Sequence, residues 1–178
     1  QMTPPTPDQQ DKQPLHIPFD IELYGSNGDV LPLRHEGEPV HSVLNITRDE
    51  QTFTFDDVSE KPVPSLFREF SAPVKVDYPY TDAQLAFLMQ HARNEFARWD
   101  AAQSLLALHI KENIRRCQAG EDLQLPEGVT DAFRAVLLDE QIDPALAAQI
   151  LTLPSETEVA EWFPVVDPDA INAVMTFI

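Results

Sequence analysis

The sequence predicts an α+β chain in which an antiparallel β-sandwich comes first and an α-solenoid-like helical segment follows. Up to about Tyr80, apolar residues alternate with polar ones, which is the period of a half-buried strand, and most of the 16 prolines lie there. After Tyr80, apolar residues recur every three or four positions, as in amphipathic helices. We therefore expect two domains, residues 1–80 and residues 81–178.

The first strand has the strongest pattern in the chain. Leu15, Ile17, Phe19, Ile21 and Leu23 alternate with polar residues or proline. The dipeptide Asn27-Gly28 then favours the positive φ angles of a hairpin turn, so residues 30–33 are expected to return as a partner strand. Pro32 places that partner at a sheet edge.

Further short strands are expected where β-branched and aromatic residues gather between Gly, Pro and Asp. These runs are residues 40–46, 52–55, 64–70 and 74–78. Together with the hairpin they make six strands, which we expect to form two antiparallel sheets sharing one apolar layer.

The helical half begins with a capping box, in which Thr81 caps the helix and Gln84 reaches back to it. One apolar face follows, made of Leu85, Leu88, Met89, Ala92, Phe96 and Trp99. Asp100 is expected to cap a second helix that carries an apolar stripe to a stop at Gly120.

Four shorter helices are expected after Gly120. Val129, Phe133, Val136 and Leu137 mark the first of them. Three start signals follow, an Asp143-Pro144 cap, a Ser155–Glu158 capping box and an Asp167-Pro168 cap. The last helix keeps its spacing to Ile178, which suggests a sequence cut from a longer protein. Tight loops between one-sided helices are typical of helix pairs stacked in a solenoid.

Composition and charge exclude several partners and compartments. The formal net charge of -18 argues against nucleic acid and anionic membranes, which both attract Lys and Arg. The single cysteine, Cys117, excludes an internal disulfide and favours the cytoplasm. No run approaches the ~20 apolar residues of a membrane-spanning helix.

The histidines do not form a zinc motif. Residues 91–95 read His-Ala-Arg-Asn-Glu, whereas a zinc-protease helix needs His-Glu-x-x-His, with both rings on one face. His109 lies on the next predicted helix and could meet His91, but no further ligand can be nominated. We expect both to be polar surface or interface residues.

The other reactive residue types also have simpler explanations. Cys117 follows two arginines but lies near a helix C-terminus, where the dipole opposes a thiolate, so we expect a packing role. The acidic cluster of Asp139, Glu140 and Asp143 is expected to mark a helix end and the next cap, and Ser26–Asp29 is expected to form a turn. Asn45–Thr47 is expected to be an unused glycosylation sequon. The basic pair Arg115–Arg116 is too short to form a basic patch. We therefore expect no catalytic, substrate-binding or metal-ligating residue in this chain.

Three stretches carry a resemblance to a known family. They are residues 13–19 (QPLHIPF), residues 98–103 (RWDAAQ), and residues 131–140 (DAFRAVLLDE) continuing through 143–148 to 153–155. The match runs along nearly the whole chain and resembles the bacterial aminopeptidase N family, the PepN-type zinc metalloaminopeptidases.

The resemblance implies an incomplete immunoglobulin-like sandwich, with its first strands missing, followed by the first helices of a truncated helical domain. It implies a non-catalytic structural fragment that links the catalytic domain to the helical lid. The parent would hold zinc and remove N-terminal amino acids from peptides. The family's His-Glu-x-x-His, downstream Glu and Gly-Ala-Met-Glu-Asn motifs have no matching positions here, so the fragment alone is expected to be inactive.

The expected partners are the remaining domains of the parent and, through it, peptide substrates. Uncovered surfaces at both ends are also expected to make the isolated chain self-associate. The alternative is a free-standing protein–protein interaction module.

Overall fold

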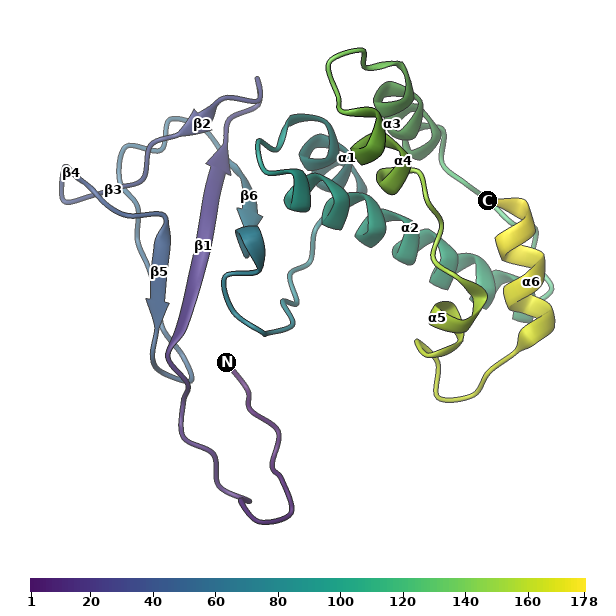
Figure 1. Cartoon of the computed structure of the whole chain (residues 1–178), viewed down its shortest axis with the longest axis horizontal. Helices are drawn as coiled ribbons and strands as arrows, with labels where there is room; N and C mark the ends of the chain where they lie inside the picture. Colours follow the sequence, from purple (N-terminus) through teal and green to yellow (C-terminus); the bar gives the residue numbers. More distant parts are fainter. The chain divides into compact units, whose positions relative to one another are not determined.

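The computed structural model describes residues 1–178, which divide into two compact units, Gln1–Tyr78 and Pro79–Ile178. The first contains six short strands and one 3₁₀ turn (Figure 1): β1 (Ile17–Tyr24), β2 (Val30–Leu31), β3 (Arg34–His35), β4 (Glu38–Pro39), β5 (Val43–Ile46), β6 (Val63–Leu66) and η1 (Arg68–Phe70).

The predicted first strand is β1, and it organises the β unit. All its pairings are antiparallel: its first half pairs with β5, with Phe19 opposite Leu44, and its second half pairs with both β2 and β6. Because β2 and β6 both pair with Leu23 and Tyr24, they lie on opposite sides of β1. The predicted hairpin is confirmed, and Gly28 takes a φ of 86° in its turn.

Two predicted strands do not form. Residues 52–55 lie outside any strand, and Asp57 just after them takes a φ of 58°, which turns the chain out of the extended region. Residues 74–78 also lie outside any strand, although Val74 and Val76 pack on a small core of Ile17, Phe67 and Ala72. In residues 74–78 the alternating apolar side chains are therefore partly buried, but the backbone does not pair with a neighbouring strand.

Other strand boundaries also differ from the prediction. The strand expected over 30–33 is β2, which ends at Leu31 before Pro32. Of the strand expected over 40–46, only Val43–Ile46 pairs with a neighbour, as β5. The strand expected over 64–70 is divided into β6 and the 3₁₀ turn η1. The β3–β4 hairpin around Gly37 was not predicted. The described ladders thus form a four-stranded sheet and a two-stranded one.

The turn after β6 is tied to β1 by charge and aromatic contacts. The Arg68 guanidinium lies 3.1 Å from the Glu22 carboxylate and 3.8 Å from the Asp20 carboxylate. The rings of Phe19 and Phe67 stack with their centroids 5.9 Å apart. These contacts hold a segment in which Phe67 takes the left-handed conformation, with a φ of 62°.

The second unit consists of six helices, as predicted: α1 (Asp82–His91), α2 (Glu95–Gln118), α3 (Glu127–Leu138), α4 (Pro144–Ile150), α5 (Glu156–Ala160) and α6 (Pro168–Phe177). The capping boxes at Thr81 and Ser155 are both formed, and the carboxylates of Asp143 and Asp167 accept backbone N–H bonds at the starts of α4 and α6. None of these six helices combines the length and the apolar character that a membrane-spanning helix requires.

The predicted start of the second helix was wrong. The chain leaves the helix at Ala92, and Asn94 caps α2 by accepting the Ala97 N–H at 3.0 Å. Asp100 therefore lies inside α2, without the backbone N–H bonds of a cap. Asp100 is exposed as a whole residue, but neighbouring atoms shield its carboxyl group from part of the solvent, and this desolvation raises the pKa of Asp100.

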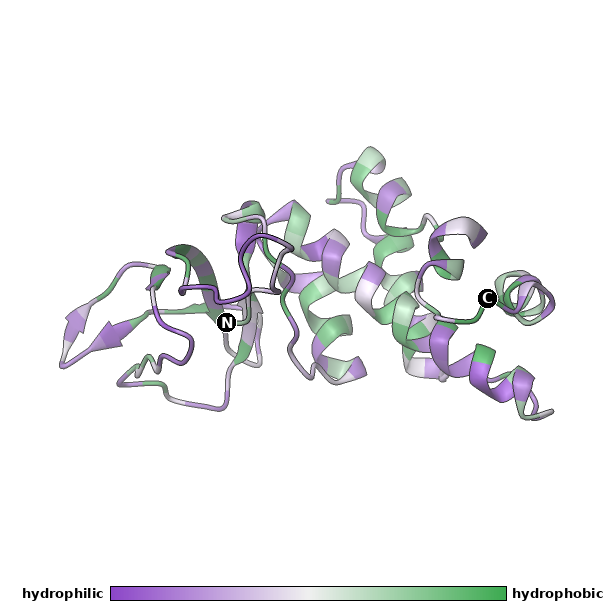
Figure 2. Ribbon diagram, turned by 90° about the horizontal axis from the view of Figure 1, so that it is seen from below, coloured by the Kyte–Doolittle hydropathy of each residue, from purple (hydrophilic) through white to green (hydrophobic).

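The helical unit buries a continuous apolar stripe of α2. Leu106, Ile110 and Ile114 pack with residues of α5 and α6, and Figure 2 shows hydrophobic and hydrophilic segments alternating along the helices. The helix ends at the predicted stop, where Gly120 has a φ of 71° and closes a Schellman motif. Leu137, expected on the buried face of α3, is instead 66% exposed.

Candidate functional site

The structure does not bring the two helical histidines together. His91 ends α1 and lies against the ring of Phe87, with centroids 4.6 Å apart. His109 instead contacts Asp82, at the opposite end of α1, through a 3.0 Å hydrogen bond. Since a ten-residue helix is about 15 Å long, these rings cannot share a ligand. No group of three or more His, Cys, Asp or Glu side chains could hold a metal ion.

The remaining reactive residue types serve local structure. Cys117 is partly buried against the apolar cluster formed by α2, α5 and α6, which confirms its packing role. Asp139 ends α3 and lies 3.7 Å from the Arg98 guanidinium, while Asp143 caps α4. The acidic cluster therefore marks a helix end and the next cap, as predicted.

Residues of the two sequence signals in the β unit take part in local hydrogen bonds. In the predicted turn, the Asn27 side-chain amide donates to the Asp29 carboxylate at 2.6 Å, and the Gly25 N–H donates to the Asp29 carbonyl at 2.9 Å. The sequon asparagine, Asn45, lies on β5 and is hydrogen-bonded to His16 through its side-chain oxygen at 2.7 Å.

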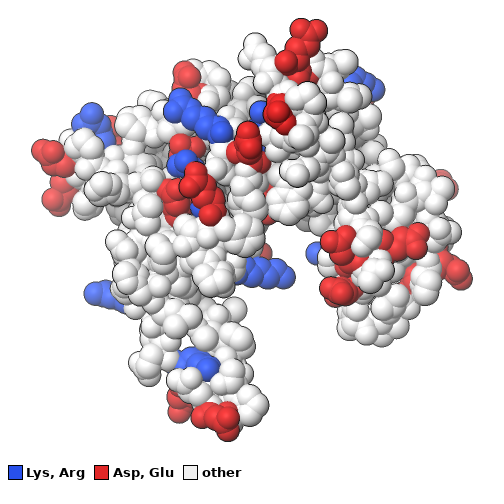
Figure 3. Space-filling model, in the orientation of Figure 1, with Lys and Arg blue, Asp and Glu red and all other residues white.

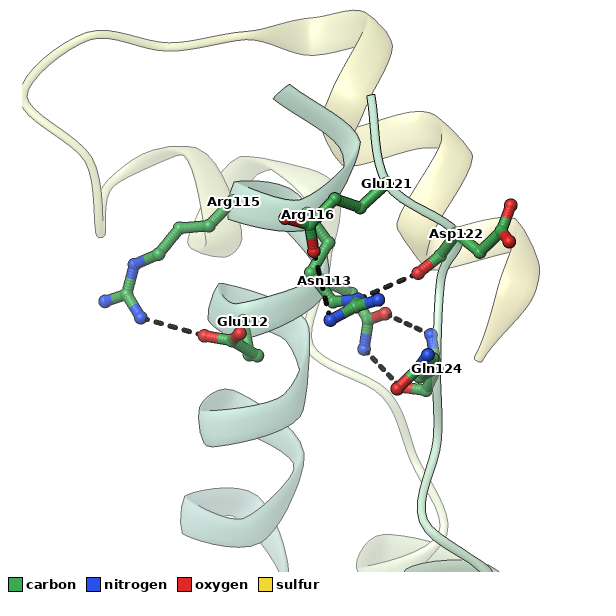
Figure 4. Close-up of polar contacts among 7 residues, drawn as sticks. All are labelled: Glu112, Asn113, Arg115, Arg116, Glu121, Asp122 and Gln124. Carbon is green, nitrogen blue, oxygen red and sulfur yellow. Dashed lines mark hydrogen bonds and ion pairs between the residues drawn. The ribbon is translucent and has the colours of Figure 1, made fainter. Parts of the chain in front are cut away.

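A network of polar contacts closes the C-terminal end of α2 (Figure 4). The buried Asn113 amide donates to the carbonyls of His109 and Gln124, and its oxygen accepts the Gln124 N–H at 2.7 Å. Arg116 reaches the Asp122 carbonyl at 2.8 Å and the Glu121 carboxylate at 3.1 Å. The basic pair is thus engaged within the chain, since Arg115 contacts Glu112 at 3.2 Å.

A surface pocket of about 720 Å³ lies between the first turns of α2 and helix α4. Phe96, Trp99 and Leu146 line it with apolar surface, and Glu95 and Asp143 add two carboxylates. The rings of Phe96 and Trp99 are 5.7 Å apart and tilted by 41°. The size falls in the usual range for small-ligand pockets.

Sequence reasoning missed this pocket and the Asn113 network. The spacing of Glu95, Phe96 and Trp99 on one helix face was a usable signal for one wall of the pocket. It was hidden because Phe96 and Trp99 were placed at the end of the first helix. The other wall, and the Gln124 partner of Asn113, come from later segments that no local pattern specifies.

Acidic side chains are spread over the surface. Asp and Glu number 30 against 12 Lys and Arg, and Figure 3 shows acidic side chains in several groups over the face in view. A charge of this sign disfavours polyanionic partners and favours cationic ones.

Comparisons with protein-family models match both halves of the chain. Residues 1–79 match a domain of unknown function (DUF3458) described as having an Ig-like fold, and residues 82–178 match a domain of unknown function (DUF3458_C) described as ARM repeats. They confirm the predicted fold class, an immunoglobulin-like β domain followed by a solenoid-like helical segment.

Curated relatives match nearly the whole chain. It is 65% identical to Aminopeptidase N of Escherichia coli over 98% of its length and 46% identical to Aminopeptidase N of Haemophilus influenzae over 100% of it. In both cases the match spans 20% of the relative, so this chain covers about a fifth of their length.

A solved structure agrees with the sequence matches. The crystal structure of Legionella pneumophila aminopeptidase A in complex with aspartic acid is 28% identical, with a TM-score of 0.74 over 90% of this chain and 18% of that one. The resemblance to bacterial aminopeptidase N stated from the sequence is confirmed. The chain belongs to the DUF3458 family, with its Ig-like part in residues 1–79 and its ARM-repeat part in residues 82–178.

Proposed function

We propose that this chain is a non-catalytic structural part of a zinc-dependent aminopeptidase, which removes N-terminal amino acids from peptides. The observation that carries the proposal is the 65% identity to Escherichia coli Aminopeptidase N over 98% of this chain but 20% of that protein. In the longer protein the chain would link the catalytic domain to a helical lid. Its partners would be the remaining domains, and its compartment the cytoplasm.

The residues of this chain do not fit the zinc that the proposal places in the longer protein. His91 and His109 lie at opposite ends of α1, and no three ligating side chains converge. A catalytic zinc site needs three protein ligands and an open position. The metal is therefore assigned to a part of the longer protein outside these residues.

The test compares the purified 178-residue chain with the longer protein on an aminoacyl-nitroanilide. We expect hydrolysis by the longer protein, sensitive to a chelator, and none by the chain with or without added zinc. Zinc-dependent hydrolysis by the chain would contradict the proposal if it disappeared in a double His91→Ala, His109→Ala variant. Hydrolysis that survived those substitutions would be checked in a mock purification, which reveals a contaminating peptidase.

We also propose that the isolated chain self-associates through apolar side chains of its helical unit. Leu138 at the end of α3 is 70% exposed, and Val165 before α6 is 80% exposed. Exposed apolar surface of this kind favours association. Sedimentation velocity should show a concentration-dependent shift that Leu138→Glu and Val165→Glu each reduce. A single monomer boundary at high concentration would contradict it.

A further inference from the structure

The pocket between α2 and α4 is lined by both aromatic and acidic side chains. Its aromatic surface comes from Phe96 and Trp99 on successive turns of α2. Its carboxylates come from both walls, Glu95 from α2 and Asp143 from the start of α4. No Lys or Arg is among the lining residues. Such a site suits a cation that can also pack against a ring.

Arg98, the basic residue at the start of α2, contacts groups outside the pocket lining. Arg98 lies between Phe96 and Trp99 in sequence, but its Nε donates to the Met89 carbonyl at 2.9 Å and its guanidinium lies 3.7 Å from the Asp139 carboxylate. The two acids of the pocket are therefore not neutralised by this neighbour. Asp143 uses one carboxylate oxygen, Oδ1, for both backbone N–H bonds that cap α4.

The same unit already contains a cation over an indole ring. The Lys111 ammonium lies 5.1 Å from the centroid of the Trp162 ring. This distance is within the range in which a cation is attracted to an aromatic face. Trp99 offers a second indole, in a pocket that two carboxylates also line and that no basic side chain lines.

We propose that this pocket binds the side chain of an arginine presented by a partner polypeptide segment. A guanidinium stacks on aromatic faces and forms directed hydrogen bonds with carboxylates, and it is more weakly hydrated than an ammonium. Arginine therefore fits a pocket lined by an indole and two carboxylates better than lysine does. The inference concerns a partner of this surface and does not depend on the activity of the longer protein.

The test uses N-acetyl-arginine N-methylamide as the probe and the indole N–H signals of Trp99 and Trp162 in NMR spectra of the 178-residue chain. Trp99→Phe assigns the two signals. We expect a saturable shift at Trp99 and none at Trp162, whose ring is occupied by Lys111. The citrulline counterpart, which has the same shape without the charge, should bind about tenfold more weakly.

Matched variants separate a specific pocket from the general acidity of the chain. Glu95→Gln and Asp143→Asn each remove one pocket charge, and Asn keeps the capping oxygen of position 143. Each should weaken arginine binding about fivefold. Glu127→Gln, which removes an acid of α3 that does not line the pocket, should leave it unchanged.

Three results would overturn the proposal. The first is equal binding of the arginine and citrulline probes, and the second is equal or tighter binding of the lysine or leucine counterpart. The third is weakening by Glu127→Gln as large as that by Glu95→Gln, which would show diffuse attraction by the acidic chain. An unmoved Trp162 signal in every variant verifies that the helical unit remains folded.

Discussion

At the residue scale, Asn113 is the side chain on which the connection after α2 depends. It is fully buried and satisfies both the N–H and the carbonyl of Gln124. Asn113→Ala should remove both hydrogen bonds from the interior of the turn and lower the free energy of unfolding by about 2 kcal/mol. Urea unfolding followed by circular dichroism measures the change. Asn172→Ala, on the exposed face of α6, is the control and should have little effect.

Two carboxylates at the starts of α5 and α6 should make these helices sensitive to acid. Hydrogen bonds from the backbone and then the hydroxyl of Ser155 lower the pKa of Glu158, and the Ala170 N–H followed by the Gln118 amide lowers that of Asp167. Because Glu158 and Asp167 bind protons less readily in the folded state than in the unfolded state, their carboxylates stabilise the folded state, and this stabilisation is fully present above the unfolded pKa. It is lost as the pH falls through the lowered value.

Glu158→Gln tests this dependence because glutamine preserves the capping box but does not titrate. Between about pH 5 and pH 3, the unmodified chain should lose more thermal stability than the variant. Thermal unfolding at a series of pH values measures the difference. Parallel profiles for the two proteins would show that Glu158 contributes nothing to acid sensitivity.

At the element scale, two glycines should respond to alanine with opposite signs. Gly120 ends α2 with a φ of 71°, where a Cβ is strained although the space around it is open. Gly128 lies inside α3, also in open space, with an ordinary helical φ. Gly120→Ala should therefore destabilise the helical unit by about 1 kcal/mol, and Gly128→Ala should stabilise it by up to about 1 kcal/mol.

Unfolding midpoints of the two glycine variants in urea provide the measurement. Each variant adds one methyl group at a solvent-exposed position, so each serves as the control for the other. Destabilisation of both would show that Gly128 is needed for a reason other than helix propensity. No loss at Gly120 would show that another residue can close the Schellman motif there.

At the scale of the whole molecule, we propose that each unit folds around its own core. The cluster centred on Ile110 contains residues of α2, α5 and α6, and the cluster around Phe67 contains residues of the β unit. Residues 79–178 expressed alone should therefore be helical and unfold cooperatively. Circular dichroism and urea titration measure this, and a helical unit that unfolded without a cooperative transition would contradict it.

Much of the helical unit could be predicted because the signals that start its helices lie close together in the sequence. The caps at Thr81, Asp143, Ser155 and Asp167 each involve side chains and backbone groups within three residues of one another. Each signal therefore lies inside a four-residue window. The strand β1 could be predicted in the same way, because its apolar residues occur at every second position. The sequence alone thus determined the order of the two halves, the number of helices and the resemblance to a family.

The tertiary structure decided what depends on partners distant in the chain. Segments 52–55 and 74–78 have strand-like patterns, but a strand requires a neighbouring ladder, and they have none. The break between α1 and α2 was predicted at Asp100 instead of Asn94, because the apolar spacing of Phe96 and Trp99 continues the pattern of α1 across Asn94. The pocket and the Asn113 network join α2 to segments beyond it. Packing between such segments is set by the folded chain as a whole, so no local pattern could specify it.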